Sequence, residues 1–334
     1  MPETTNIARM ADLVSKEIFS VFGWERVGPT NTDWECVELE KHHKKTTKSH
    51  PSDVVFRYSH PYFAHNVYVT TDLKSYARDT IDKNAVARPL RELAVAVECA
   101  NKSQAFQRLY VDDDQNWEAI GMLFVYNHDG DFDKDFNLFL EEIQPSQVPV
   151  PKGKWVAAIG PARVAYLNTI AHDILAERGR HALPDAKMCG FYYPDLNQLR
   201  VYSQRVVPAA TLEMIMGPWQ VLRYEDASAR GKSGYYFYYD GKGESTDEFQ
   251  YVLDYIFKYQ LLGDNDQISL RLPFGVAEAS AIFDIAKKQY HHDYWHLGEE
   301  SPDESKARLE RVSFQSVTAI TQRFSDIEIG MTRE

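Results

Sequence analysis

The chain has 334 residues, enough for one large or two medium-sized domains with a buried core. Hydrophobic residues make up 44% of it, as in ordinary globular proteins. No apolar run approaches the roughly 20 residues that a bilayer-spanning helix needs, and the polar N-terminal segment lacks the apolar stretch of a signal peptide. We therefore expect a cytoplasmic protein that does not associate with membranes.

The net charge of −12 argues at first against a nucleic-acid partner, but the charge is unevenly distributed. Residues 1–110 contain fifteen Lys and Arg against fourteen Asp and Glu, so their net charge is +1 and residues 111–334 carry −13. The near-neutral first third also holds the basic run KHHKKTTK at 41–48. Its lysines Lys44, Lys45 and Lys48 are candidates for phosphate contacts, although a solvated loop explains the run equally well.

Three cysteines, Cys36, Cys99 and Cys189, are far apart in the sequence and odd in number. Their spacing gives neither a metal-ligand pattern nor a disulfide framework. We interpret them as reduced thiols, which agrees with a cytoplasmic location.

The first predicted element is a helix, which Thr4, Thr5 or Asn6 can cap and whose apolar stripe extends to Val21. Glu17 lies on or beside this stripe, where an acid is either solvated or functional. The patterns that follow predict strands at 34–39, 53–58, 66–74 and 118–126, and helices at 75–108 and 133–143. We expect the longer helix to be interrupted before Pro89.

A proline-rich connector at 145–154 leads into further strands and helices. From about Gly217 the elements follow the order strand, strand, helix, strand, helix, strand. This order predicts an α+β domain of the ferredoxin-like type, appended to a mixed α/β unit. We therefore expect three segments, at 1–145, 146–216 and 217–334.

The strand at 66–74 ends with Asp72 and Lys74, whose side chains point to the same side because strand residues alternate. An acid, any residue and a lysine also occur at 185–187, 240–242 and 304–306, so the triplet alone is uninformative. Only at 72–74 does it close an alternating strand. Asp53 opens the preceding strand, and antiparallel pairing of the two strands would bring Asp53 next to Asp72.

This chain resembles the PD-(D/E)xK superfamily in the order of four residues and in the predicted elements that carry them. These residues are Glu17, Asp53, Asp72 and Lys74. Members of that superfamily carry an acid on a helix, Pro-Asp at the start of a strand, Asp/Glu-x-Lys at the end of the next strand, and a covering helix. The chain departs from this pattern where Ser52 separates the proline from the aspartate.

The resemblance covers roughly residues 5–130 and implies a restriction-endonuclease-like mixed sheet flanked by helices. On this basis, residues 1–145 form the nuclease-like core, 146–216 extend it, and 217–334 serve recognition or assembly. The segments NTDWECVELEKHHKKT and DVVFRY also resemble those of anti-phage defence nucleases.

The resemblance further implies a Mg²⁺ site, in which Mn²⁺ can substitute. Asp53 and Asp72 would be ligands, because Mg²⁺ prefers oxygen. By the same resemblance, the backbone carbonyl of Leu73 is a ligand and Glu17 reaches the metal directly or through water. Lys74 would orient the attacking water or offset transition-state charge. The alternative is an incidental surface pair of Asp72 and Lys74, worth about 0–1 kcal/mol.

Two functions therefore compete. The first is a Mg²⁺-dependent endodeoxyribonuclease that cleaves foreign DNA in bacterial defence. The second is a catalytically inactive subunit of the same fold that binds nucleic acid or a protein partner. The aromatic residues at 235–239 cannot all face one core, so another element or a partner must cover some of them. Since tyrosine is favoured at interfaces, we expect a protein partner or a homo-oligomer.

Overall fold

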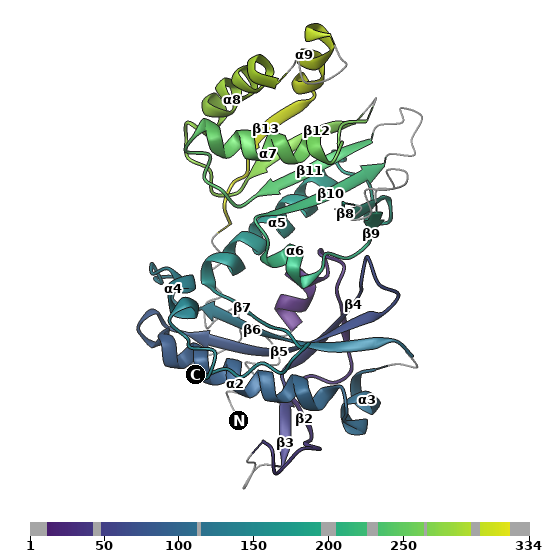
Figure 1. Ribbon diagram of the computed structural model, residues 1–334, viewed down its shortest axis with the longest axis vertical. Coiled ribbons are helices and arrows are strands. Elements are labelled where there is room, and N and C mark those ends of the chain that lie inside the picture. The colour runs from purple at the N-terminus through teal and green to yellow at the C-terminus, as the bar shows by residue number, and fades with distance from the viewer. Residues whose placement is uncertain are drawn as a thin grey trace, which may run out of the picture. The chain divides into compact units, whose positions relative to one another are not determined.

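The computed structural model describes residues 12–42, 48–111, 115–194, 205–225, 233–263, 266–294 and 301–320. The chain divides into two compact units. The first contains the described residues up to Leu167, and the second contains those from Asn168 to Ile320. Each unit is built on its own sheet (Figure 1).

The sheet of the first unit is mixed and has the strand order β1-β4-β5-β6-β7. Its strands are β1 (Glu25–Val27), β4 (Val54–Ser59), β5 (Asn66–Tyr76), β6 (Trp117–Asn127) and β7 (Val156–Ile159). β1, β4 and β5 pair antiparallel, whereas β5, β6 and β7 run parallel. Parallel neighbours need a crossover connection, and helices provide it here. They are α2 (Lys83–Ala100) and α3 (Gln104–Tyr110) before β6, and α4 (Phe136–Glu141) before β7. The predicted mixed α/β architecture is thus confirmed.

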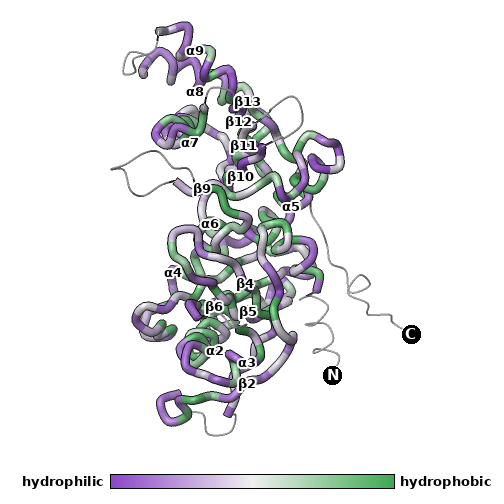
Figure 2. Tube along the Cα trace, turned by 90° about the vertical axis from the view of Figure 1, so that its right-hand side faces the viewer, coloured by the Kyte–Doolittle hydropathy of each residue, from purple (hydrophilic) through white to green (hydrophobic). Residues whose placement is uncertain are grey.

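Helices cover both faces of this sheet. α2 lies along one face (Figure 1), where Val55 packs in a buried cluster with Cys99. The π-helix η1 (Val14–Phe19) covers the other face, where the rings of Phe19 and Phe56 have centroids 4.8 Å apart. Val55 and Phe56 are strand neighbours and therefore point to opposite faces. Figure 2 shows the resulting concentration of apolar residues in β4, β5 and β6.

The helical region predicted at 75–108 consists of the 3-10 turn η2 (Arg78–Thr80), α2 and α3. The interruption expected at Pro89 is wrong, since this residue lies inside α2 and is buried. A proline there removes one helix hydrogen bond, but the packing of the surrounding turns retains the helix. The break comes after Ala100, where the Ser103 side chain accepts a hydrogen bond from the Phe106 N–H and caps α3.

A separate two-stranded sheet pairs β2 (Thr32–Glu35) with β3 (Ser49–Ser52). Cys36 directly follows β2, and its sulfur lies 3.6 Å from that of Cys99 on α2. The fold therefore brings together two cysteines that are 63 positions apart, a proximity that their spacing in the sequence did not indicate. Cys189 lies in the second unit, and all three cysteines are free thiols.

The sheet of the second unit has the order β13-β12-β11-β10-β8-β9. Its strands are β8 (Cys189–Tyr193), β9 (Arg205–Val207), β10 (Trp219–Glu225), β11 (Ser233–Tyr239), β12 (Gln267–Leu272) and β13 (Val312–Ser316). The remaining helices are α5 (Pro161–Gly179), η3 (Ala186–Met188), α6 (Leu212–Met216), α7 (Thr246–Lys258), α8 (Ala279–Tyr294) and α9 (Pro302–Glu310). In the described part of the chain, no helix combines the length and apolar character needed to cross a membrane.

The second unit begins earlier than the boundary expected near Gly217, because β8 pairs with both β9 and β10. It also repeats the strand directions of the first unit. β8, β10 and β11 pair antiparallel, whereas β11, β12 and β13 run parallel with helical crossovers between them. The ferredoxin-like domain is therefore not confirmed, because β11, β12 and β13 are parallel neighbours that follow one another in the sequence. The repeat is one of strand order and direction.

The five aromatic side chains at 235–239 on β11 are all buried within the chain. Alternate rings pack in the cluster beneath α7 and α8. On the opposite face, the hydroxyls of Tyr236 and Tyr238 donate to Glu177 and Asp173 of α5, at 2.8 and 2.7 Å. An element of the same chain therefore covers the second face, and these rings no longer argue for a partner.

Candidate functional site

The pairing of β4 with β5 brings two of the predicted site acids together. Val54 pairs with Thr71, so Asp53 lies opposite Asp72, and the Asp53 N–H donates to the Thr71 carbonyl at 3.2 Å. Asp53 is only 8% exposed. Burial, followed by the charge of the neighbouring Asp72, raises the pKa of Asp53 to about 6. The two carboxylates therefore converge, as the strand pairing predicted.

Lys74 completes a close group with these acids. Its Nζ lies 2.6 Å from Asp72 Oδ1, and the two side chains are 31% and 21% exposed. Burial by itself would lower the pKa of Lys74, but the charge of Asp72 and the hydrogen bond to it outweigh burial and raise this pKa. Lys74 is therefore a fixed positive charge at neutral pH.

The backbone of Leu73 also faces Asp53. Its N–H donates to Asp53 Oδ2 at 2.7 Å. The N–H and C=O of one strand residue point toward the same neighbouring strand, so the Leu73 carbonyl lies on the side of Asp53 and not on that of β6. The site thus offers a carbonyl oxygen in addition to two carboxylates.

Glu17 lies on η1, which packs on the face of the sheet opposite α2. It is partly buried, and its Oε2 atom has no hydrogen-bond partner among the described residues. Within that part of the chain, no hydrogen bond or ion pair joins Glu17 to Asp53, Asp72 or Lys74. The structure therefore brings three of the four predicted residues together and leaves the role of Glu17 a prediction.

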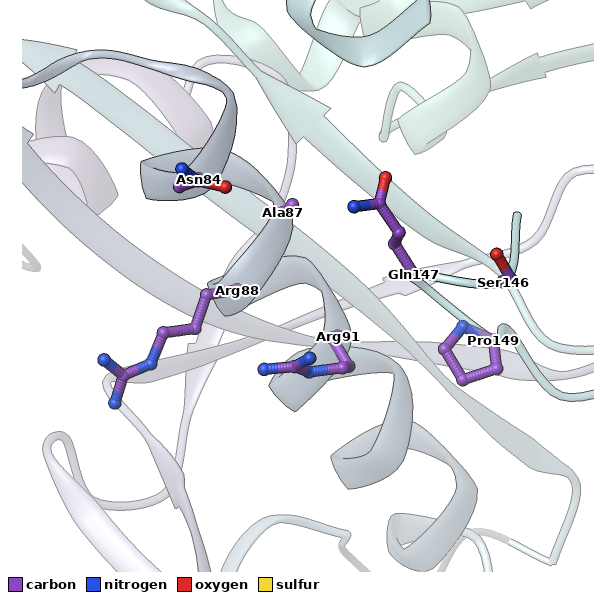
Figure 3. A pocket seen from close by; sticks show the side chains of 7 residues that line it. All are labelled: Asn84, Ala87, Arg88, Arg91, Ser146, Gln147 and Pro149. Carbon is purple, nitrogen blue, oxygen red and sulfur yellow. The ribbon is translucent and has the colours of Figure 1, made fainter. Parts of the chain in front are cut away.

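Two adjoining pockets lie beside Lys74, along the N-terminal half of α2. The first has a volume of about 440 Å³ and is lined by Lys74, Tyr76, Arg88 and neighbouring residues of α2. The second, of about 550 Å³, shares Arg88 and adds Arg91 (Figure 3). Figure 3 shows both arginine side chains extending from α2, with Gln147 on the loop beyond the pocket.

The sequence interpretation missed these arginines. Guanidinium groups suit phosphate recognition because their planar donors match phosphate geometry. The signal that could have found them is their spacing of three residues on the helix that follows the Asp-x-Lys strand, which places both on one face. Arg88 also pairs with Glu92 at 3.2 Å, a contact between exposed side chains that a phosphate can displace.

The structure bears on only part of the predicted basic run. Lys44 and Lys45 lie outside the described residues. Lys48 is exposed, and its backbone carbonyl accepts a hydrogen bond from the Cys36 N–H at 2.9 Å. Its ammonium is thus accessible to solvent, and phosphate binding by this run stays a prediction.

The convergent oxygen atoms fit a hard divalent cation. The carboxylates of Asp53 and Asp72 and the carbonyl of Leu73 are ligands of the type that Mg²⁺ prefers. Burial and, after it, the charge of Asp72 raise the pKa of Asp53, and a cation bound between the two carboxylates would remove their mutual repulsion.

Comparison with protein families matches residues 1–163 to the family described as the GAPS4 protein PD-(D/E)XK nuclease domain. No curated protein matches the chain. GAPS4 is an anti-phage system protein, so both the PD-(D/E)xK resemblance and the defence context are confirmed. The match contains all four predicted site residues and ends close to Leu167, the last residue of the first unit before the division. Residues 1–163, just under half of the chain, are therefore similar to the PD-(D/E)XK nuclease domain of GAPS4 proteins.

Proposed function

We propose that the chain is a metal-dependent deoxyribonuclease that hydrolyses phosphodiester bonds of foreign DNA in the cytoplasm. The observation that carries this proposal is the convergence of Asp53, Asp72 and Lys74 beside pockets lined by Arg88 and Arg91. The family match supports the nuclease chemistry, and the arginines support a substrate that carries phosphates.

The residues at the site would hold Mg²⁺, for which Mn²⁺ can substitute. Asp53 and Asp72 would bind it through carboxylate oxygens, Leu73 through its carbonyl, and Glu17 through an intervening water. When bound, the ion would lower the pKa of a coordinated water and neutralise phosphate charge. Asp53 must be ionised to act as a ligand, so metal affinity, and with it activity at limiting metal, should rise with pH through about 6.

Lys74 would donate hydrogen bonds from its ammonium group to the attacking water or to a phosphate oxygen. Because its pKa is raised, it stays protonated at neutral pH and cannot serve as a general base. Asp72 holds the ammonium in place at 2.6 Å, so the positive charge is already positioned when negative charge develops on the phosphate.

The DNA backbone would lie along α2, with Arg88 and Arg91 as phosphate contacts and Lys44, Lys45 and Lys48 as further ones. Residues 111–334 carry a net charge of −13 and would repel DNA outside this path. Such an acidic region also suits docking to a basic protein surface, and we propose a protein partner or a homo-oligomer on this ground.

The test is cleavage of supercoiled plasmid, linear DNA and single-stranded RNA with Mg²⁺, with Mn²⁺ or with EDTA. We expect metal-dependent cleavage of DNA, and we expect Asp72→Ala and Lys74→Ala to lower its rate by roughly 10²-fold or more.

The second unit supplies matched controls. Asp240 and Lys242 have the same spacing and follow β11, the strand that corresponds to β5, but both are exposed. The residue opposite Asp240 is Pro218, whose carbonyl accepts from the Asp240 N–H, so no second carboxylate corresponds to Asp53. Asp240→Ala and Lys242→Ala should therefore cleave at the wild-type rate.

Three outcomes would contradict the proposal. Undiminished cleavage by Asp72→Ala would show that the site is elsewhere. A wild-type protein that binds DNA but cleaves nothing with either metal would favour the inactive subunit. Cleavage of RNA alone would refute the assignment of DNA as the substrate.

A further inference from the structure

A second group of ligand-type side chains lies in the first unit, apart from the acids of the proposed nuclease site. It consists of Cys36, His42, His50 and Cys99, each of which offers one sulfur or ring nitrogen, and these four atoms all lie within 4.8 Å of one another. Cys36 follows β2, His50 lies on β3, and Cys99 lies near the end of α2. The group therefore joins the β2–β3 hairpin to the helix.

The distances among three of the four ligand atoms, those of Cys36, Cys99 and His42, are close to the distances in a tetrahedral zinc site. The two sulfurs lie 3.6 Å apart, and each lies 3.4 Å from His42 Nδ1. Zn–S bonds of about 2.3 Å and Zn–N bonds of about 2.0–2.1 Å at tetrahedral angles place two sulfurs about 3.8 Å apart and a sulfur and a nitrogen about 3.6 Å apart. A disulfide would need an S–S distance of about 2.05 Å.

The surroundings of the group favour metal ligands. His42 Nε2 lies 3.2 Å from Glu98 Oε2, and Nδ1 on the other side of the ring faces the two sulfurs. A carboxylate at Nε2 favours the tautomer whose Nδ1 lone pair is available to a metal. A carboxylate behind a metal-binding histidine fixes the ring and raises its basicity. Lys41 also pairs with Glu98.

Backbone groups also point at one of the sulfurs. The backbone N–H groups of Val37 and Glu38 donate hydrogen bonds to the Cys99 sulfur. Hydrogen bonds of this kind stabilise a thiolate. A metal cation bound in place of the thiol protons would stabilise the thiolates further.

We propose that Cys36, His42, His50 and Cys99 bind one structural Zn²⁺ ion. Four protein ligands close the coordination sphere and leave no position for a substrate, which is typical of structural zinc sites. The side chains are buried, with exposures of 2% for Cys36 and His42, 1% for His50 and none for Cys99. Thiolate and imidazole ligands select zinc over Mg²⁺, so this site is chemically distinct from the oxygen ligands around Asp53.

The ion would hold the hairpin in place. A two-stranded hairpin is marginally stable by itself, and β2 and β3 form a sheet separate from the main one. His50 precedes Asp53 by three residues, and the intervening Ser52 accepts a hydrogen bond from Trp34 Nε1 at 3.0 Å. His42 and His50 also flank, in sequence, the segment with Lys44, Lys45 and Lys48. Zinc would thus support both the strand that leads to Asp53 and the two ends of the basic run.

The test is the metal content of the full chain, purified without chelators and measured by elemental mass spectrometry. We expect about one zinc per chain, which Cys36→Ser and Cys99→Ser should each reduce to below about a tenth. The matched control is Cys189→Ser, which removes the third cysteine and should keep the zinc, because Cys189 lies in the second unit.

A second measurement uses the wild-type chain, so it remains decisive even where the cysteine variants fail to fold. The wild-type chain is stripped of metal, kept reduced and titrated with Co²⁺, and we expect the intense visible bands of tetrahedral cobalt bound to thiolate, with saturation at one equivalent and displacement by Zn²⁺. A chain that holds no zinc and binds no Co²⁺ would overturn the proposal, as would iron in place of zinc. So would a Cys36–Cys99 disulfide in the native protein, or equal loss of zinc in Cys189→Ser. None of these readouts depends on DNA cleavage.

Discussion

Replacing Asp53 by asparagine should make the metal-free protein more stable at neutral pH, although it should abolish cleavage. Asparagine keeps the shape of the side chain, and its carbonyl oxygen can still accept the hydrogen bond from the Leu73 N–H. What it removes is a carboxylate that is 8% exposed and lies beside Asp72. A pKa raised from 3.8 to about 6 corresponds to about 3 kcal/mol of destabilisation when this group is ionised.

The effect should depend on pH in a defined direction. Below about pH 3.8, Asp53 is protonated in the folded and in the unfolded chain, so wild type and Asp53→Asn should be equally stable. Between about pH 4 and 6 the folded chain retains a proton that the unfolded chain has released, so the stability of wild type falls relative to the variant as pH rises. Above about pH 6 the difference should remain constant at about 3 kcal/mol.

The assay is urea or thermal unfolding of both proteins across this pH range, without and with Mg²⁺. The difference corresponds to roughly 6–12 °C in melting temperature for a unit of this size. Mg²⁺ should raise the stability of wild type and leave Asp53→Asn unchanged, because only wild type has both carboxylates. Asp240→Asn is the control and should show no pH-dependent difference, since its carboxylate is exposed. A metal-free Asp53→Asn protein that is less stable than wild type at pH 8 would refute the reasoning.

Four further predictions concern the substrate path, the second unit and assembly. Arg88→Ala combined with Arg91→Ala should weaken DNA binding and lower the slope of log K against log salt by roughly two units; Arg180→Ala, an exposed arginine of the second unit, should not change the slope. Joint replacement of Lys44, Lys45 and Lys48 by alanine should lower the slope by roughly one unit for each lysine that binds a phosphate, and an unchanged slope would leave the run a solvated loop. Arg271→Ala should destabilise the second unit by about 3–5 kcal/mol in urea unfolding. The substitution removes the guanidinium that binds Asp173 through hydrogen bonds of 2.7 and 2.8 Å, and it leaves this largely buried carboxylate with the Tyr238 hydroxyl as a neutral donor. Full stability of this variant would show that the pair contributes little. Light scattering on the purified chain, alone and after pull-down from its native host, should reveal an oligomer or a co-purifying protein, and a monomer without a partner in both samples would contradict the assembly.

The sequence by itself determined many of the elements and pointed to Asp53, Asp72 and Lys74 as the candidate site. Strand β5 was predicted at 66–74 and lies at Asn66–Tyr76, and the helix predicted at 133–143 contains α4, Phe136–Glu141. Such predictions succeed because alternation and helical periodicity depend on residues a few positions apart. Asp53, Asp72 and Lys74 could be found for the same reason, since two of them end one strand and the third opens its antiparallel neighbour.

Only the tertiary structure decided which distant segments meet. The sequence could not show that β8 pairs with β10, that α5 covers Tyr236 and Tyr238, or that Cys99 reaches Cys36. Contacts between residues that are tens of positions apart depend on how all the apolar faces pack together. A local sequence pattern carries no information about this packing. The zinc ligands illustrate the limit, because a spacing of six, eight and then forty-nine positions from Cys36 to Cys99 matches no short motif. The fold places them together only because the hairpin packs against the end of α2.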